Sequence, residues 1–244
     1  MLSNAQSKYI RSLTQQKYRK QDNVFIVEGD KMAKEWLSAS ANVKMIVATE
    51  DWIAENTSLI AKNPDAEICT VQVFELEKIS TLHTPNKALL VVPQPEQSLT
   101  TEGWTICVER LQDPGNMGTI IRIADWFGVK RVVATADSVD FYNPKVVQSA
   151  MGGHLRVELH VADLDDYIRQ SNLPSYAAVL GGDDVFTIPT SEQGILLIGN
   201  ESKGLSDELA KLATHKVAIQ GKGAAESLNA GVATGILTAV LCRS

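Results

Sequence analysis

Short, unbroken apolar runs alternate along the chain with stretches in which apolar residues recur every three or four positions. Runs such as Ala88–Val92 and Ile195–Ile198 have the length of strands buried on both faces. The spacing of apolar residues from 116 to 127 predicts a helix with one buried face. By these criteria we expect strands at 23–29, 44–48, 67–71, 88–92, 104–109, 131–134, 156–161, 176–180, 195–198 and 216–219, and helices at 3–15, 31–39, 51–62, 116–127, 143–151, 206–213 and 227–241.

Capping residues mark the ends of several predicted helices. Asn143 is an N-cap followed by Pro144 at the first helical position. Asp163 opens a further helix, and Ser206 precedes two acidic residues that suit a first turn. Gly128 follows a helix as its C′ residue. Strands and helices therefore alternate through most of the chain, which is the pattern of an α/β fold.

A change in composition separates two groups of elements. The stretch 93–103 contains two prolines and almost no large apolar residue, which indicates a linker or a surface crossover. We therefore predict a small α/β domain over 1–93, a linker over 94–103 and a second α/β domain over 104–244. The second domain is expected to hold a mostly parallel sheet of about six strands.

The composition is that of a soluble protein with a full core. Of 244 residues, 44% are hydrophobic and 21% are charged. No apolar stretch approaches the roughly 18–20 residues that span a membrane, and the N-terminus lacks the apolar core of a signal peptide. Cys69, Cys107 and Cys242 are isolated, and the histidines are scattered. We therefore expect a cytoplasmic protein without a metal site or disulfides.

The distribution of charge is more informative than its sum. A net charge of −6 argues against a protein that coats nucleic acid. Residues 1–20, however, contain no acid and carry two tyrosines among their cations. Such a basic arm is a candidate RNA contact, although a solvated amphipathic helix explains it equally well. Its cations are Lys8, Arg11, Lys17, Arg19 and Lys20.

Several familiar catalytic sites are absent from the sequence. No GxxxxGK[ST] loop exists, which excludes a P-loop nucleotide hydrolase. The turn after the strand at 104–109 does not match GxGxxG, so a dinucleotide-binding fold loses its main support. GxSxG and HExxH are also missing. What remains are three loops rich in glycine and asparagine, at 116–122, 199–204 and 219–229.

Each loop has a simpler explanation when it is considered alone. The loop at 199–204 follows a buried strand and precedes a helix, as any tight βα connection does. Arg122 lies next to the apolar stripe of its helix, where an arginine needs an anionic partner, and a salt bridge within the domain would suffice. It lies roughly 240° around that helix from Asn116, so the two need not share a face. Ser227 is a plausible N-cap for the last helix.

Taken in order, the three loops resemble the motifs of the SpoU/TrmH family of RNA ribose methyltransferases, within the SPOUT class. The match spans about 106 to 242, and the first domain also looks like the family's substrate-binding module. The matching motifs are Asn116-x-Gly118-x-x-x-Arg122-x-Ala124-x-x-Phe127-Gly128, Gly199-Asn200-Glu201-x-x-Gly204-Leu205 and Glu226-Ser227-Leu228-Asn229.

The resemblance implies a C-terminal SPOUT domain with a deep trefoil knot. It also implies a homodimer that packs through the knot region, with the final apolar helix contributing. The knot loops would hold S-adenosylmethionine in a bent shape through backbone groups. Gln220 stands where the family usually has proline. The residues implied to contact the cofactor are Gly199, Asn200, Gly204, Ile219 and Leu228.

The implied reaction is transfer of a methyl group to a ribose 2′-hydroxyl of structured RNA, with ribosomal RNA favoured over tRNA. A neutral arginine is costly, so we favour a role in which Arg122 binds the adjacent phosphate and orients the hydroxyl. A catalytically inactive RNA-binding or ribosome-assembly protein and a SPOUT base methyltransferase stay open as alternatives. The residues implied to be catalytic are Arg122, Asn116, Glu201, Ser227 and Asn229.

Overall fold

The computed structural model describes residues 2–39, 42–82, 84–85, 87–96, 99–189 and 191–243. The chain divides into two units. Unit 1 comprises Met1–Glu96 and Tyr142–Leu155, and unit 2 comprises Gln97–Phe141 and Arg156–Ser244. Within the predicted linker 94–103, Gln97 and Ser98 lie outside the described residues.

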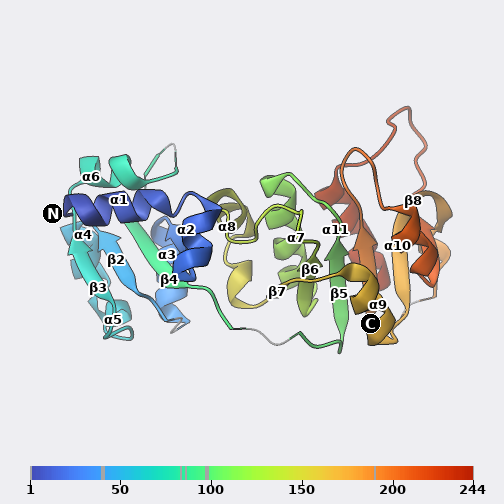
Figure 1. Cartoon of the computed structure of the whole chain (residues 1–244), viewed down its shortest axis with the longest axis horizontal. Coiled ribbons are helices and arrows are strands. Elements are labelled where there is room, and N and C mark those ends of the chain that lie inside the picture. The colour runs from blue at the N-terminus through green and yellow to red at the C-terminus, as the bar shows by residue number, and fades with distance from the viewer. Residues whose placement is uncertain are drawn as a thin grey trace. The chain divides into compact units, whose positions relative to one another are not determined.

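Unit 1 is built on a four-stranded sheet in the order β1-β4-β2-β3 (Figure 1). β4 pairs antiparallel with both β1 and β2, and β2 pairs parallel with β3. These strands match the four that the apolar runs predict for the first domain. They span Val24–Glu28 (β1), Met45–Ala48 (β2), Glu67–Thr70 (β3) and Ala88–Pro93 (β4).

Helices cover both faces of this sheet, because successive side chains of a strand point to opposite faces. Phe25 and Val27 of β1 join one core with α3, α4, α5 and α8, whereas Val24 and Ile26 join the other core with α1 and α6. The helices of unit 1 are α1 (Asn4–Ser12), α2 (Gln16–Asp22), α3 (Asp30–Ser38), α4 (Glu50–Glu55), α5 (Thr57–Ile60), α6 (Val73–Ile79) and α8 (Pro144–Ala150), with a 3₁₀ turn η1 (Gly153–Leu155).

A segment from the middle of the chain, Tyr142–Leu155, belongs to unit 1. Val147 is buried in the same core as Phe25. The ring centroids of Tyr142 and His154 lie 4.9 and 6.1 Å from that of Phe25. The predicted boundaries follow the order of the sequence and assign this segment to the second domain, whereas its packing groups it with the N-terminal residues.

Unit 2 contains a six-stranded sheet in the order β10-β8-β9-β5-β6-β7, in which all neighbours are parallel. This confirms the predicted fold class. The strands span Trp104–Val108 (β5), Arg131–Ala134 (β6), Glu158–Val161 (β7), Ser175–Asp184 (β8), Gly194–Ile198 (β9) and His215–Ala218 (β10). The helices are α7 (Pro114–Trp126), α9 (Leu164–Ser171), α10 (Asp207–Leu212) and α11 (Ala230–Leu241), with a 3₁₀ turn η2 (Val185–Thr187).

The loops that follow β5 and β9 leave the sheet side by side. The two strands are neighbours, and the backbone N–H of Glu109 donates to the carbonyl of Ile198 at 2.9 Å. From β5 the chain crosses through α7 to β6 on one side, while β9 lies on the other side. This is a topological switch point, where open α/β sheets bind their ligands.

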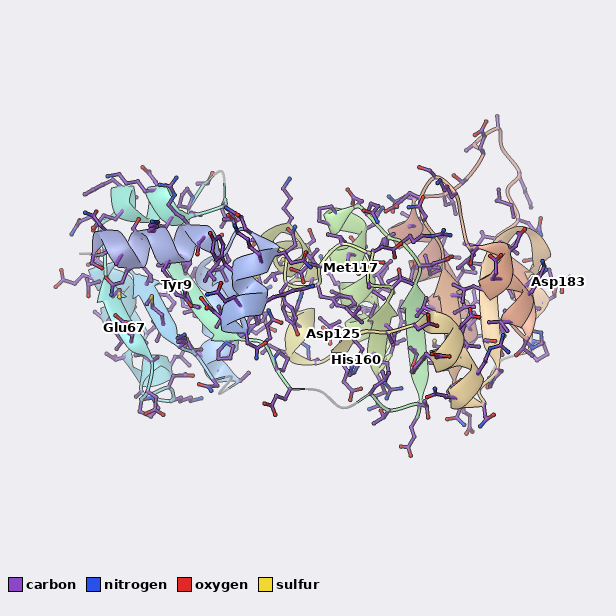
Figure 2. All side chains as sticks on the ribbon, in the orientation of Figure 1. Tyr9, Glu67, Met117, Asp125, His160 and Asp183 are labelled. Carbon is purple, nitrogen blue, oxygen red and sulfur yellow. The ribbon has the colours of Figure 1, made fainter. Side chains whose placement is uncertain are left out.

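Helix α11 returns from the edge of the sheet to its centre. It follows the edge strand β10 yet packs on α7 and β9. A Cβ at Gly231 would lie 2.9 Å from the Thr119 side chain, so the start of α11 lies close against α7. Met117 and Asp125 mark α7 in Figure 2; Met117 is fully buried, and Asp125 pairs with Arg156 at 2.8 Å. A return to the sheet centre is the course that the trefoil knot requires of the C-terminal segment.

Two helix starts differ from the prediction. Helix α7 begins at Pro114, with Asp113 as N-cap accepting from the backbone N–H of Asn116 at 2.7 Å. The Asp-Pro pair is the same signal as Asn143-Pro144, and it places the first turn two residues earlier than predicted. Helix α11 begins at Ala230 with Asn229 as its N-cap, so the alternative of Ser227 as the cap is wrong.

Other differences arise where the signals are short. The predicted helix at 51–62 is two helices, α4 and α5, interrupted at Asn56. Helices α2 and α6 were not predicted, because each has only seven residues and the spacing of apolar residues identifies a helix only over a longer stretch.

Among the described residues, no helix has both the length and the apolar character to cross a membrane.

Strand β8 leaves no room for a side chain at Gly182. The ladder between β8 and β10 shifts register between Lys216 and Val217, and a Cβ at Gly182 would lie 2.8 Å from backbone atoms of both. The register shift therefore depends on glycine at this position.

We expect Gly182→Ala to lower the free energy of unfolding by about 1–3 kcal/mol, because the main chain of β10 must move. Gly221→Ala is the matched control, since no described atom lies within 4 Å of its Cβ position, and its effect should stay below about 0.5 kcal/mol. Urea unfolding followed by circular dichroism measures both. Equal midpoints for the two variants would contradict this packing.

Candidate active site at the carboxyl ends of β5 and β9

A chain of side-chain hydrogen bonds joins the three motif loops. The Nδ2 of Asn229 donates to the Oδ1 of Asn116 at 2.8 Å. The Nδ2 of Asn116 in turn donates to the Oε1 of Glu201 at 3.2 Å. Asn116 is buried between its two partners, which lie 85 and 113 residues away in the sequence. One residue from each motif therefore meets in a single polar cluster.

The direction of these hydrogen bonds is set at both ends. The Oδ1 of Asn229 accepts from the backbone N–H groups of Gly231 at 2.9 Å and Val232 at 3.2 Å, so its Nδ2 faces Asn116. At the other end the carboxylate of Glu201 only accepts. The orientation of the Asn116 amide follows from its neighbours, because the flipped amide would place its oxygen against the Glu201 carboxylate and its Nδ2 against the Nδ2 of Asn229.

Glu201 also binds the N-terminus of α7. Its carboxylate accepts from the backbone N–H groups of Asp113 at 3.2 Å and Gln112 at 3.5 Å. Burial raises the pKa of Glu201, but hydrogen bonds from its own backbone, from Asn116 and from these two amides outweigh burial and lower the pKa below its ordinary value. The carboxylate is therefore ionised at neutral pH, as suits a helix N-terminus, and is a weak proton acceptor.

Asn200 closes the second loop on itself. Its Oδ1 accepts from the backbone N–H groups of Ser202 and Lys203 at 2.9 and 3.1 Å, and its Nδ2 donates to the carbonyl of Arg110 at 2.7 Å. Its backbone pairs with that of Gly204 in both directions. The loop thus has a fixed shape in the protein alone.

The two glycines of this loop are needed for different reasons. A Cβ at Gly199 would lie 2.1 Å from the backbone of Gly204 and Leu205, which no side chain permits. Gly204 adopts a φ of 69°, which favours glycine. Position 199 therefore requires glycine for the packing of the loop's own backbone.

Sequence reasoning missed Glu109, which supports the same loops. It is 7% exposed, its Oε2 accepts from the backbone N–H of Ser206 at 2.7 Å, and its Oε1 lies 3.0 Å from the guanidinium of Arg110. Arg110 itself has a φ of 55°, which is uncommon outside glycine. A carboxylate directly after a fully buried strand is the signal that could have identified this position.

Arg122 is exposed on α7 and does not share the buried face of Asn116. It forms no hydrogen bond or ion pair with any residue that the structure describes. The alternative of a salt bridge within the domain therefore finds no support. Its guanidinium is available to an anion from outside the chain.

The third loop presents its main chain to solvent. From Ile219 to Leu228, no backbone group forms a hydrogen bond with another described residue. Ser227 is exposed, and the side chain of Leu228 is 48% exposed. Gln220 donates from Nε2 to the carbonyl of Gly182 at 3.3 Å, which ties the loop to β8. Unpaired backbone groups beside an exposed leucine suit a ligand that is held through main-chain contacts.

The predicted RNA-binding cations lie on α1 and α2 of unit 1. Lys8, Arg11, Lys17 and Lys20 are exposed. Arg19 is 1% exposed, and its Nη1 donates to the carbonyl of Leu13 at 2.8 Å, so it stabilises the turn between the two helices. Across the described residues, no group of three or more His, Cys, Asp or Glu side chains could hold a metal ion.

Comparisons with known proteins match both parts of the chain. The SpoU rRNA Methylase family matches residues 103–239, and the MRM3-like substrate binding domain matches residues 4–89. The Bacillus subtilis protein named 23S rRNA (guanosine(2553)-2'-O)-methyltransferase RlmP is 29% identical over 243 residues, which cover 96% of this chain and 94% of that protein.

Solved structures match almost the whole chain. A TrmH-family protein from Porphyromonas gingivalis is 35% identical with a TM-score of 0.86, covering 99% of this chain and 98% of that one. An AdoMet-bound rRNA methyltransferase from Sinorhizobium meliloti is 29% identical with a TM-score of 0.90, covering 99% and 95%. With its three motif loops joined at one site and its family match over more than half its length, the chain belongs to the SpoU rRNA methylase family.

Proposed function

We propose that this protein transfers a methyl group from S-adenosylmethionine to a ribose 2′-hydroxyl of ribosomal RNA. The observation that carries the proposal is the hydrogen-bond chain from Asn229 through Asn116 to Glu201, which assembles the three motif loops of a SpoU-family chain. The naming of RlmP as a 23S rRNA 2'-O-methyltransferase supports ribosomal RNA as the substrate class. We also propose the cytoplasm as its site of action, because the chain is similar over nearly its whole length to RlmP of the bacterium Bacillus subtilis.

The cofactor site that we propose is built from the second and third loops. The unpaired backbone from Ile219 to Leu228 offers donors and acceptors, and the exposed leucine side chain offers an apolar contact. Gly199, Asn200 and Gly204 hold the facing loop in a fixed shape. The AdoMet-bound Sinorhizobium meliloti structure supports S-adenosylmethionine as the cofactor. When it is bound, S-adenosylmethionine supplies an activated methyl group on a sulfonium.

The other residues of the proposed site have separate roles. The guanidinium of Arg122 matches the geometry of a phosphate, so Arg122 binds a phosphate next to the target ribose and orients the hydroxyl. Glu201 holds loops together through an ionised carboxylate whose pKa is lowered, so proton removal is assigned to the bound phosphate or to solvent. Ser227 is exposed beside Leu228 and is free to bind the ribose. Asn116 and Asn229 position these loops.

The proposal includes a homodimer that packs through α11. This helix has no charged residue and is mostly apolar, yet Val232 is 52% exposed and Ile236 is only partly buried. Trp126, at the end of the neighbouring helix α7, is 82% exposed. Apolar side chains that stay exposed on two adjacent helices mark a surface that another chain covers.

The central test of the proposed reaction is Arg122→Ala. We expect methyl transfer to an rRNA substrate to fall by about 10²–10³-fold, because the phosphate and hydroxyl lose their positioning group. Cofactor affinity, measured by isothermal titration calorimetry, should change by less than about twofold, since the proposed cofactor loops lie elsewhere.

Arg169→Ala is the matched control, because Arg169 is also an exposed helical arginine, on α9. Its methylation rate should stay within about twofold of the wild type. Mass spectrometry of the product nucleosides separates the possible outcomes. Ribose-methylated nucleosides support the proposal, whereas base-methylated nucleosides, or turnover that survives Arg122→Ala, would overturn it.

A second prediction follows from the lowered pKa of Glu201. Its folded-state pKa lies below the ordinary value of 4.5, so its ionised form adds stability that is present above pH 4.5 and lost as the pH falls through the folded pKa. The melting temperature of the wild type should exceed that of Glu201→Gln at neutral pH, and the difference should shrink in acid. Differential scanning fluorimetry from about pH 3 to 8 measures this. A difference that grows toward acid would show the opposite coupling.

The dimer is tested by Val232→Asp in the full chain. We expect a charge at this exposed position to shift the protein from dimer to monomer in multi-angle light scattering, with unchanged far-UV circular dichroism. Val161→Asp, at a valine that is 62% exposed on the edge strand β7, should leave the mass unchanged. A monomeric wild type, or a Val232→Asp protein that stays dimeric, would refute this interface.

A further inference from the structure

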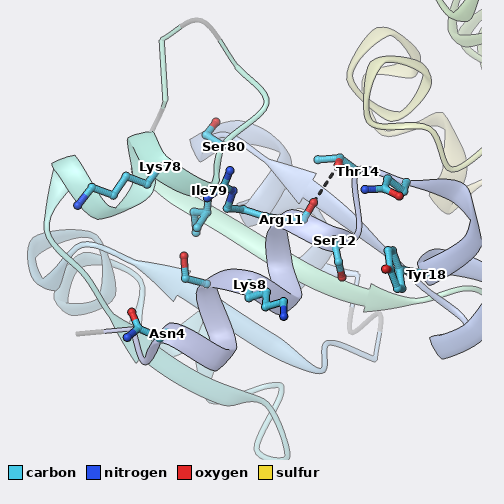
Figure 3. Close-up of a pocket in the computed structure, with 11 residues that line it drawn as sticks. Asn4, Lys8, Arg11, Ser12, Thr14, Tyr18, Lys78, Ile79 and Ser80 are labelled. Atoms are coloured by element: carbon cyan, nitrogen blue, oxygen red, sulfur yellow. Dashed lines mark hydrogen bonds between the residues drawn. The ribbon is translucent and has the colours of Figure 1, made fainter.

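A basic groove of about 720 Å³ lies on unit 1, between α1, the start of α2 and the end of α6 (Figure 3). Lys8 and Arg11 of α1 line one side, and Lys78 of α6 lines the other. The other lining side chains are small polar groups, Tyr18 and Ile79, and none of the described lining residues is acidic. The groove therefore concentrates positive charge on a protein whose net charge is −6.

The three cations of the groove have no acidic partner among the residues that the structure describes. Lys8, Arg11 and Lys78 are exposed, and in the part of the chain that the structure describes none of them forms an ion pair. Elsewhere in unit 1, Lys34 pairs with Asp30 at 2.8 Å. Three cations that line one groove attract an anion with several charges, such as consecutive phosphodiesters.

Aromatic rings accompany these cations. Tyr18 lines the groove, and the Nζ of Lys17 lies 4.6 Å from its ring centroid. Phe74, one turn before Lys78 on α6, is 53% exposed, and the Nζ of Lys78 lies 5.0 Å from its centroid. Tyr18 is partly buried against the core, which holds its ring in place. Aromatic rings among cations are how proteins bind unstacked bases and their phosphates together. This combination favours a nucleic acid over an acidic peptide.

The shape of the groove has a local cause. Helix α1 ends at Ser12, and the Oγ1 of Thr14 donates to the carbonyl of Arg11 at 2.8 Å, which turns the chain away toward α2 (Figure 3). Ile10 and Ile79 anchor α1 and α6 side by side in the core beneath. The polar faces of the two helices are thereby held apart as the walls of the groove.

We propose that this groove binds a single-stranded or loop segment of the RNA substrate, with Lys8, Arg11 and Lys78 on its phosphates and Tyr18 stacked on a base. The inference rests on the proposed function, because it assigns the contact that unit 1 makes with that RNA. It adds Lys78, which lies outside the basic arm of the sequence. It leaves out Arg19, which is buried under the helices.

The test uses the full-length protein and a fluorescein-labelled, mixed-sequence 20-nucleotide single-stranded RNA in fluorescence anisotropy. Lys8→Ala/Lys78→Ala should weaken binding by about tenfold or more. It should also reduce the slope of log affinity against log salt by about 1.4, at roughly 0.7 for each lost phosphate contact. Tyr18→Leu should weaken binding by about tenfold without changing that slope, because a stacking contact releases no counterions.

Lys62→Ala is the matched control, because Lys62 is an exposed lysine that does not line the groove. It should bind within twofold of the wild type and keep its salt slope. Wild-type affinity and slope in Lys8→Ala/Lys78→Ala, or a wild type that does not bind the RNA, would overturn the groove.

Methylation assays separate this inference from the proposed function. With rRNA as substrate, Lys8→Ala/Lys78→Ala should raise KM by about tenfold and leave kcat within twofold, since its cations lie outside the proposed catalytic set. An unchanged KM would reject the groove while the proposed reaction stands. Absence of any methyl transfer by the wild type would reject the reaction, and the anisotropy series would still decide the groove.

Discussion

The hydrogen-bond chain from Asn229 through Asn116 to Glu201 is the interaction on which the candidate site depends. Each end is fixed by groups that cannot reverse their role: backbone N–H groups of α11 at one end and a carboxylate at the other. A buried polar group with a missing partner costs about 1–3 kcal/mol, so the three loops are held to one arrangement. Glu109 and Asn200 add contacts of the same kind around it.

This arrangement separates residues that position from residues that stay available. Asn116, Glu201 and Asn229 have their polar atoms engaged within the protein. Arg122 and Ser227 are exposed, and the backbone of the third loop is unpaired among the described residues. A rigid polar frame beside unpaired groups is what a site for two ligands requires, because the frame fixes the geometry while the unpaired groups do the binding.

Much of the fold and the meeting of the three loops could be predicted from the sequence. Every strand of the described residues falls on a predicted one. Burial on both faces leaves a continuous apolar run in strands such as β4 and β9, whereas the more exposed β3 and β7 have mixed sequences. Long-range packing left no such signal in the sequence. Tertiary structure alone places Val147 in unit 1, buries Arg19 and brings Lys78 close to α1. The N-caps Asp113 of α7 and Asn229 of α11 could both have been predicted from the sequence.

A double-mutant cycle on the affinity for S-adenosylmethionine tests the central claim most directly. Asn116→Ala, Asn229→Ala and the double variant are compared with the wild type by isothermal titration calorimetry. If one hydrogen-bond chain holds the cofactor loops, either single substitution already breaks it, so the second should lower the affinity little further. The two effects on the binding free energy should therefore couple by about 1–3 kcal/mol. Effects that add to within about 0.5 kcal/mol would show that the two asparagines act independently and would contradict the account.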